Sequence, residues 1–228
     1  MISCVMATSD RAPFVRQALR CFAAQTYPDR ELIVVDDGEK PVSALCRDVP
    51  GVRHIRLRHY TPTGTKTNIG IEAARGDVIQ KIDDDDYYGP DFLATQMRHH
   101  RKRSLVTRCC FLVLFKGDPQ VRHSGHGWNP GGAFCFHRSM WKRHPFRDLR
   151  KSIDSWFLAD NDPPLVRICG HVEQYIVVRH GANTWNLMTT GLADDYLRDL
   201  EPYPKSIREL AGPLQARFYC SPPRRPVL

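Results

Sequence analysis

Short apolar runs and amphipathic stretches alternate over the first hundred residues of the chain. Strands are predicted at 2–7, 31–35, 52–57 and 77–82, and the first two are the apolar runs typical of buried strands. Between them, apolar residues recur at helical spacing in 12–24, 42–47, 67–74 and 90–101. Asp10 is a candidate cap of the first helix. Strands that alternate with helices predict an α/β fold, with a mostly parallel sheet and helices on both of its faces.

The second half of the chain is less regular and predicts a smaller mixed region. Apolar stretches predict strands at 104–115, 133–136 and 172–179, and a glycine-rich loop is expected at 117–132. Helices are expected through Met140 and Trp141, from Ser152 onward, and at 205–210. Residues 221–228 resemble a loose tail. With no internal repeat and no obvious linker, one domain is expected over residues 1–220.

Polar residues gather where three of the expected strands end. Thr8-Ser9-Asp10 follows the first strand, Asp36-Asp37 the second, and Asp83-Asp84-Asp85-Asp86 the fourth. Because right-handed crossovers bring the carboxyl ends of parallel strands to one edge, these side chains are expected to lie near one another. Ligands of such sheets bind at that edge.

The four consecutive aspartates are the strongest local sign of chemistry. Carboxylates this close repel each other, so some hold protons at neutral pH unless a cation compensates. Mg²⁺ and Mn²⁺ prefer oxygen ligands and are commonly held by one or two carboxylates together with substrate phosphates. Metal binding is therefore the favoured interpretation. The alternative is a solvated acidic turn in which Asp86 or Asp91 caps the next helix.

Composition and charge narrow the function classes. The chain has 228 residues, 42% of them hydrophobic, which is ordinary for a globular protein with a core of its own. It lacks an apolar run of membrane-spanning length and the charged start and apolar stretch of a signal peptide, so a cytoplasmic location is expected. The net charge of +8 comes from scattered basic residues, apart from 99–103 and Arg224-Arg225. These runs are interpreted as solvated surface, and no nucleic-acid partner is expected.

The eight cysteines show no metal-ligand spacing. They stand at 4, 21, 46, 109, 110, 135, 169 and 220, without a C-x-x-C pair. Free buried thiols are therefore expected, with no zinc site and no functional cysteine. The histidines of His123-Ser124-Gly125-His126 have no evident partner and are placed in a loop.

Three motifs follow one another in the first hundred residues. Thr26-Tyr27-Pro28 precedes Glu31-Leu32-Ile33-Val34-Val35-Asp36-Asp37-Gly38, Asn68-x-Gly70 leads to Gly76-Asp77, and Ile82 and the aspartates lead to Tyr87-Tyr88-Gly89-Pro90. In this order and spacing, clear over residues 1–95, they resemble a family 2 glycosyltransferase of the GT-A fold. The resemblance implies a nucleotide-sugar-binding half at 1–100 and an acceptor-binding half at 101–220.

The resemblance implies a donor site built from the strand ends. Asp36 or Asp37 would contact the nucleotide base, and Ala7, Thr8 and Asp10 would line the nucleoside pocket. Of the aspartate run, Asp83 would approach the ribose, with Asp84 beside it, and Asp85 would be the chief ligand of Mn²⁺ or Mg²⁺. Lys66 would add positive charge near the phosphates, or is simply an exposed lysine at a helix start. The donor would be a nucleotide-diphosphate sugar, with a UDP-sugar preferred.

The resemblance also implies catalytic and acceptor residues in the second half. Asp154 would be the catalytic base, with Asp148, Asp160 and Asp162 as rivals and a helix cap as its alternative role. Gly131 and Gly132 would lie beside the acceptor, and Trp128 would stack on it or pack in the core. In the segment 179–185, His180 would complete the metal site or donate to the diphosphate, and Arg179 would face phosphate.

A metal-dependent inverting glycosyltransferase is the expected function. Its partners are a nucleotide-sugar donor and an unidentified acceptor: a saccharide, a natural product, a lipid-linked sugar or a peptide. A sugar-nucleotide pyrophosphorylase is the nearest alternative enzyme, but the turn after the first strand lacks the usual glycine-rich phosphate loop. A basic, non-catalytic nucleic-acid-binding module is the alternative from another class.

Overall fold

The computed structural model describes residues 1–181, 183 and 196–222. The tail expected at 221–228 therefore lies mostly outside the described residues, as do positions 182, 184 and 185 of the motif at 179–185. Within the described ranges no helix is both long and apolar enough to cross a membrane.

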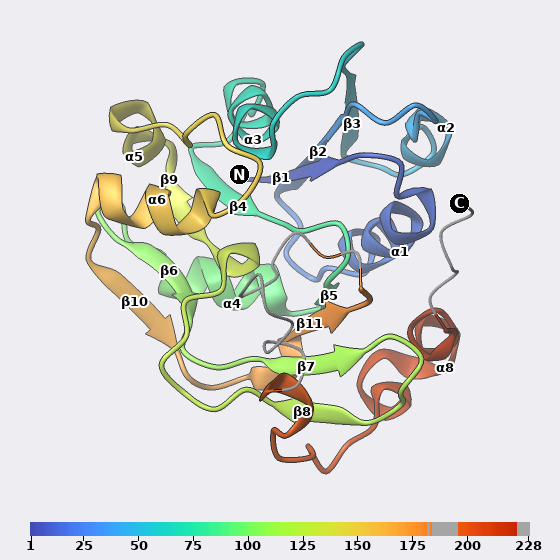
Figure 1. Cartoon of the computed structure of the whole chain (residues 1–228). Helices are drawn as coiled ribbons and strands as arrows, with labels where there is room; N and C mark the ends of the chain where they lie inside the picture. The colour runs from blue at the N-terminus through green and yellow to red at the C-terminus, as the bar shows by residue number, and fades with distance from the viewer. Residues whose placement is uncertain (182, 184–195, 223–228) are drawn as a thin grey trace.

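Seven strands form the larger sheet, in the order β10-β6-β9-β4-β1-β2-β3 (Figure 1). Their bounds are β1 Ile2–Thr8, β2 Arg30–Asp36, β3 Val52–Arg56, β4 Val78–Lys81, β6 Leu105–Arg108, β9 Cys135–His137 and β10 Leu165–Ile168. Only β9 runs against its neighbours, pairing antiparallel with both β4 and β6. The carboxyl ends of the other six strands therefore share one edge, as the sequence predicts for the first half.

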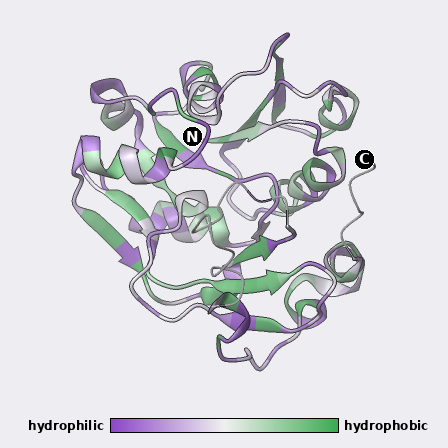
Figure 2. Cartoon of the chain, in the orientation of Figure 1, coloured by the Kyte–Doolittle hydropathy of each residue, from purple (hydrophilic) through white to green (hydrophobic). Residues whose placement is uncertain are grey.

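Helices cover both faces of this sheet. The alternation of strand side chains is visible on β1, where Cys4 and Met6 pack in one core cluster and Val5 packs in the other. The first cluster includes α1 Ala12–Ala23, α2 Ser43–Cys46 and α4 Phe92–His99, and the second includes α3 Thr63–Glu72, α5 Arg138–Arg143 and α6 Ile153–Asn161. Figure 2 shows the strands as the most apolar part of the ribbon.

A second, smaller sheet of mixed direction lies beside the first. Its order is β5-β11-β7-β8, and the strands span β5 Tyr87–Tyr88, β7 Leu112–Phe115, β8 Val121–His123 and β11 Tyr175–Arg179. The short helices η1 Gly131–Ala133 and η2 Val172–Gln174 precede β9 and β11, and the kinked helix α8 Ile207–Cys220 packs against this sheet (Figure 1). The expected smaller mixed region is present.

Some elements differ from the expectation. The apolar stretch 104–115 is two strands in different sheets, because the backbone turns away after Arg108 and Phe111 N–H bonds Ser124 Oγ at 3.0 Å. The loop expected at 117–132 contains β8, and α8 extends far beyond residue 210. Asp10 does not cap α1: its carboxylate accepts a hydrogen bond from Lys40 N–H at 2.9 Å instead.

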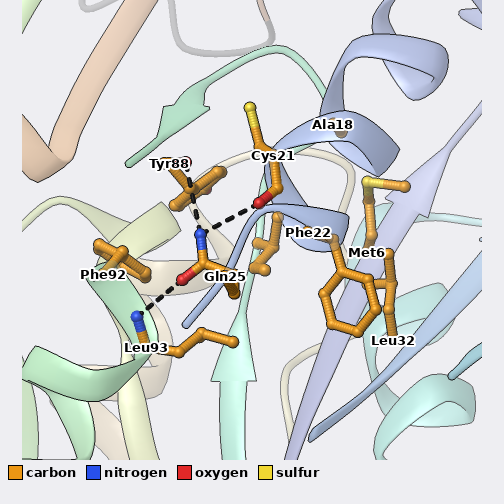
Figure 3. Close-up of a pocket in the computed structure, with 10 residues that line it drawn as sticks. Met6, Ala18, Cys21, Phe22, Gln25, Leu32, Tyr88, Phe92 and Leu93 are labelled. Atoms are coloured by element: carbon orange, nitrogen blue, oxygen red, sulfur yellow. Dashed lines mark hydrogen bonds between the residues drawn. The ribbon is translucent and has the colours of Figure 1, made fainter. Parts of the chain in front are cut away.

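Gln25 fixes the segment that follows the aspartate run. Its buried amide donates to the carbonyls of Cys21 and Tyr88 at 3.1 and 3.4 Å and accepts from Leu93 N–H at 3.0 Å (Figure 3). It also donates to the carbonyl of Gly89 at 2.8 Å. The void beside it measures about 10 Å³, room for a water molecule at most. The amide thus joins the end of α1 to β5 and α4, which holds the aspartates at the sheet edge.

The expectation of free thiols is wrong at one pair. Cys109 and Cys169 form a disulfide, although 60 residues separate them. Parallel pairing of β6 with β10 brings them together, and sequence spacing alone does not show that pairing. Cys4, Cys21 and most of the other cysteines are free and buried, as expected.

Candidate active site

A cleft of about 650 Å³ lies at the carboxyl edge of the larger sheet. Its walls come from both halves of the chain and bring together all four aspartates at 83–86, Asp154, and a set of basic side chains: Arg11, Lys66, Lys81, Arg150, Lys151 and Arg179. The mix of acidic and basic walls suits a ligand that carries phosphate together with a cation.

Asp84 closes the turn after β1 rather than pointing freely into the cleft. Its Oδ2 accepts a hydrogen bond from Thr8 Oγ1 at 2.7 Å, and its Oδ1 accepts from Arg11 Nη1 at 2.8 Å. Burial raises the pKa of Asp84, and the charge of Arg11 opposes that rise. Asp84 therefore ties the first strand to the aspartate run, and Thr8 lies at the cleft wall.

Asp85 is the most heavily contacted member of the run. Its Oδ2 accepts from Arg11 Nη1 at 3.0 Å and Asn183 Nδ2 at 3.2 Å, and lies 3.0 Å from His180 Nε2. Burial raises its pKa, but the hydrogen bond to His180 and the charge of Arg11 bring the net pKa of Asp85 below its usual range. The carboxylate is thus held ionised.

His180 is positioned by packing as well as by this contact. Its ring lies 4.3 Å from the ring of Phe14, and its backbone N–H donates to Asn183 Oδ1 at 2.9 Å. Histidine from the end of β11 therefore reaches the aspartates that follow β4. Sequence reasoning singled out His180 but missed Arg11 and Asn183, whose positions follow from the turn after β1 and the loop after β11.

The donor set at this point fits a divalent cation. Cis ligands of a six-coordinate ion with bonds of about 2.1 Å lie on the order of 3 Å apart, the separation of Asp85 Oδ2 and His180 Nε2. Oxygen and imidazole ligands suit Mn²⁺ and related ions. The guanidinium of Arg11 already contacts the same carboxylate oxygen, so the position accepts positive charge. Asp83 turns instead to Lys81, whose Nζ donates to its Oδ1 at 2.6 Å.

Asp154 enters the cleft from the first turn of α6. Its Oδ1 lies 3.4 Å from Lys81 Nζ and accepts no hydrogen bond from the described residues. Burial and the charge of Asp83 raise the pKa of Asp154, while Lys81 lowers it, and the net direction is upward. A carboxylate with a raised pKa and an oxygen that accepts no hydrogen bond from the described residues is equipped to take a proton.

Lys81 links the two carboxylates and was missed by sequence reasoning. It is the last residue of β4 and only 5% exposed, between Asp83 and Asp154. Burial lowers its pKa, but the two carboxylates raise it further, so Lys81 stays charged. A lysine inside an apolar strand pattern gave no distinct signal, because its partners come from later in the chain.

Asp86 has a structural position between the two sheets. Its Oδ2 accepts from Tyr175 Oη at 2.7 Å and its Oδ1 from Val178 N–H at 3.0 Å. Burial, with the charges of the neighbouring aspartates, raises its pKa well above the usual range. It does not cap the following helix, and neither does Asp91, which accepts from Thr26 Oγ1 instead.

Three acidic residues expected at the donor site are not among those that line the cleft. Asp36 is fully buried and accepts from Gly38 and Val42 N–H at 2.9 and 3.0 Å. Asp37 accepts from Lys66 Nζ at 2.7 Å, and Asp10 is exposed. Lys66 itself is only 5% exposed and lines the cleft, so it is not the exposed helix-start lysine of the alternative interpretation.

The glycine pair forms the floor of the cleft next to Asp154. A Cβ on Gly131 would lie 2.0 Å from Asp154 Oδ2, and a Cβ on Gly132 would lie 2.5 Å from Tyr175 Oη and 2.8 Å from Asp83 Oδ2. Side chains at either position would displace these polar groups. Trp128 lines the same wall, with its Nε1–H bonded to Ser124 O at 3.0 Å and its ring against Phe111.

The rival aspartates lie elsewhere. Asp148 accepts from Thr65 Oγ1, Asp160 pairs with Arg147 at 2.6 Å, and Asp162 ends α6 with φ 40°. None of them is among the residues that line the cleft. Tyr60, 67% exposed at the cleft rim, is a further lining residue that the sequence did not single out.

Comparisons with known proteins point to one family. A family model described as glycosyl transferase family 2 matches residues 3–162. An uncharacterised glycosyltransferase of Bacillus subtilis, YwdF, is 36% identical over 125 residues, which cover 54% of this chain and 46% of YwdF. The chain therefore spans about half the length of that relative.

Two solved structures share the fold at low sequence identity. A mannosyltransferase from Pyrobaculum calidifontis, in complex with GDP-Man and Mn²⁺, has a TM-score of 0.65 and 15% identity, covering 96% of this chain and 69% of its own. Staphylococcus aureus TarS 1–349, in complex with UDP-GlcNAc, has a TM-score of 0.60 and 16% identity, covering 80% and 60%. Both likenesses show a shared fold.

Proposed function

The chain belongs to glycosyl transferase family 2, and from that premise we propose that it transfers a sugar from a nucleotide-diphosphate sugar to an acceptor hydroxyl. One observation carries the proposal. Asp85, held ionised after β4, and Asp154, with a raised pKa at the start of α6, line the same cleft. The pair provides an anionic anchor for a cation and a base within one site.

Asp154 is the proposed base. Its Oδ1 accepts no hydrogen bond from the described residues, and the carboxylate packs closely against Gly131, where a side chain would displace it. It would take the proton of the acceptor hydroxyl as the oxygen attacks the anomeric carbon, with inversion at that carbon. Lys81 acts as a positioning residue, since it holds the carboxylate and its charge opposes the rise that burial causes in the pKa of Asp154.

Asp85 and His180 are the residues proposed to hold Mn²⁺ or Mg²⁺, with Asp83 and Asp84 beside them. A bound divalent ion would neutralise charge on the diphosphate leaving group. Arg11 contributes positive charge at the same place, because its guanidinium already contacts Asp84 and Asp85.

The donor is proposed to lie along the ends of β1 and β4. Ala7 and Thr8 at the end of β1 and Tyr60 in the loop after β3 line the cleft and would contact the nucleoside. Lys66, fixed by Asp37 and the carbonyl of Thr8, would face the phosphates. A UDP-sugar is the first donor to test, supported by the TarS complex, and a GDP-sugar is the second, supported by the mannosyltransferase complex.

The two aspartates expected to contact the nucleotide base act indirectly in this proposal, by holding other parts of the site. Asp36 holds the loop after β2, and Asp37 holds Lys66 and the N–H of Thr61. The acceptor would enter past Trp128 and the pair Gly131-Gly132, which precede β9 on the side of β4 away from β1.

A donor-turnover assay tests the proposal. The purified chain is incubated with UDP-, GDP- and CDP-sugars, with Mn²⁺ or with a chelator, and release of nucleoside diphosphate is measured with and without simple sugar acceptors. The expected result is release from one nucleotide class, stimulated by Mn²⁺ and reduced about 10²–10⁴-fold in Asp154→Asn. Asp148→Asn, at a carboxylate outside the cleft, is the matched control and keeps wild-type turnover. Equal turnover by Asp154→Asn would remove the assignment of the base.

A further inference from the structure

Two cysteines occupy equivalent positions at the ends of neighbouring strands. β6 and β10 are parallel, and Arg108 pairs with Ile168 at their last residues. The next residue on each strand is a cysteine, Cys109 or Cys169, with Cα atoms 5.2 Å apart and the two sulfurs joined as a disulfide. The pair lies at the same carboxyl edge of the sheet as the cleft, beyond β9 from the aspartates.

A histidine from a distant loop completes the group. His126 Nδ1 lies 3.3 Å from Cys109 Sγ, and this nitrogen and both sulfurs lie within 4.8 Å of one another. His126 stands between Gly125 and Gly127, which adopt φ of 72° and 98°. A disulfide needs no third residue, whereas two thiolates and an imidazole are a common donor set for zinc.

We propose that Cys109, Cys169 and His126 bind Zn²⁺ when the cysteines are reduced, and that the disulfide is the metal-free oxidised state of the same site. The two states exclude each other, because the metal binds cysteine as thiolate and a sulfur in a disulfide carries no thiolate charge. Three protein ligands leave the fourth tetrahedral position for water. The site lies apart from the acidic cleft and goes beyond the proposed sugar transfer.

The chemistry of the switch balances with a dithiol as reductant. The dithiol gives two electrons and two protons to the Cys109–Cys169 bond, which becomes two thiols, and is itself converted to a disulfide. Zn²⁺ then binds the two sulfurs as thiolates, and both thiol protons pass to solvent. Cys109 is buried, while His126 and Cys169 are exposed, so the metal can enter from solvent.

Arg108 fixes the backbone next to the pair. Its guanidinium is fully buried and donates to the carbonyls of Gly170 and His171, just after Cys169, at 3.2 and 3.3 Å. Cys110 is the next sulfur, 3.8 Å from Cys109 Sγ, but its S–H bonds the carbonyl of Cys169 and burial raises its pKa. Cys110 therefore remains a thiol outside the donor set.

The site would control a wall of the cleft. His126 and Trp128 belong to one loop, and Trp128 N–H donates to the carbonyl of Cys109 at 3.1 Å. In the disulfide state the imidazole contacts Cys109 Sγ and the ring of His123, and no bond to a metal holds it. A metal bond would fasten the loop to β6 and β10 directly, so the environment of Trp128 should differ between the two states.

Cobalt binding gives the sharpest test, because Co²⁺ reports its ligands through its spectrum. The full chain is reduced with a dithiol, which is then removed anaerobically, and Co²⁺ and Zn²⁺ are titrated in turn. We expect one Co²⁺ with thiolate charge-transfer absorption and tetrahedral visible bands, displaced by Zn²⁺. The untreated disulfide form should show neither feature. Carboxylate binding at the aspartates gives no thiolate band, so it cannot imitate the result.

Matched histidine variants separate a metal site from a simple disulfide. His126→Ala should weaken Zn²⁺ binding by at least about tenfold yet still form the disulfide. His123 is the neighbouring histidine, with its ring centroid 6.0 Å from that of His126, and His123→Ala should bind Zn²⁺ as wild type does. Cys169→Ser should lose both metal and disulfide. The proposal is overturned if reduced wild type shows no thiolate band, or if His126→Ala binds Zn²⁺ as tightly as wild type.

Discussion

Gly131→Ala is expected to disable the proposed base, Asp154, by displacing its carboxylate while leaving the residue itself unchanged. A Cβ at this position would lie 2.0 Å from Asp154 Oδ2 and 2.1 Å from its Cγ, whereas ordinary contact begins at 3.4 Å. The carboxylate must therefore withdraw by about 1.4 Å, the difference between the two distances. Misplacing a reacting group by 1 Å costs roughly 10²-fold in rate. We expect kcat to fall at least about 10²-fold, or about 2.7 kcal/mol in activation free energy.

The assay is steady-state release of nucleoside diphosphate from the donor that the wild type uses. KM for the donor should change little, because Asp154 and Gly131 lie on the acceptor side of the proposed site. Gly170→Ala is the control at the same sheet edge, since its Cβ would meet no atom within 4 Å. It should keep wild-type kcat.

A double-mutant cycle decides whether the loss acts through Asp154. If Gly131→Ala works by displacing that carboxylate, adding it to Asp154→Asn should lower kcat little further. Wild-type kcat in Gly131→Ala would refute the reasoning, and so would full additivity of the two losses.

Three further results are expected. Turnover should fall on the acid side with a midpoint above the ordinary aspartate pKa, because burial raises the pKa of Asp154. Lys81→Met should move that midpoint to higher pH, because the charge of Lys81 lowers the pKa of Asp154. The pH profile of kcat/KM for each protein measures both shifts. Tyr175→Phe should lower the free energy of unfolding by about 1–3 kcal/mol in urea melts, since Asp86 would lose the 2.7 Å hydrogen bond from a buried hydroxyl. Arg11→Met should make thermal stability more responsive to Mn²⁺, because two buried carboxylates would lose their cation; an unchanged Tm response to Mn²⁺ would contradict this.

The regular part of the fold was predictable because its signals are local. The strands at 2–7, 31–35 and 77–82 are apolar runs bounded by aspartates or glycine, and each appears within a residue or two of its expected limits. The single stretch 104–115 failed, since an apolar run looks the same whether its residues enter one sheet or two. Strand β10 was missed because Leu165–Ile168 includes the exposed Arg167 and has no alternating pattern.

The candidate site was predictable where a residue acts from a strand end and hidden where it acts through a long side chain. Asp85 follows β4 directly, and a family resemblance singled out Asp154 at the start of α6. Arg11 and Lys81 reach their carboxylate partners across the fold, so neither their spacing nor their neighbours in sequence indicates the contact. Asp36 was expected at the donor site because it ends a strand, but it accepts a hydrogen bond from the backbone N–H of Gly38 instead. A position at a strand end does not show whether a carboxylate binds a ligand or a loop.

Whether the cleft is a metal-assisted donor site can be measured by calorimetric titration of UDP and GDP into the full chain, with Mn²⁺ and then with a chelator. We expect one nucleoside diphosphate to bind, chelation to weaken its binding, and Asp85→Asn to bind it weakly even in Mn²⁺. Asp148→Asn should bind as wild type. Equally tight binding by Asp85→Asn and wild type in Mn²⁺, or binding of neither nucleotide to the wild type, would contradict the assignment of the cleft as a metal-assisted donor site.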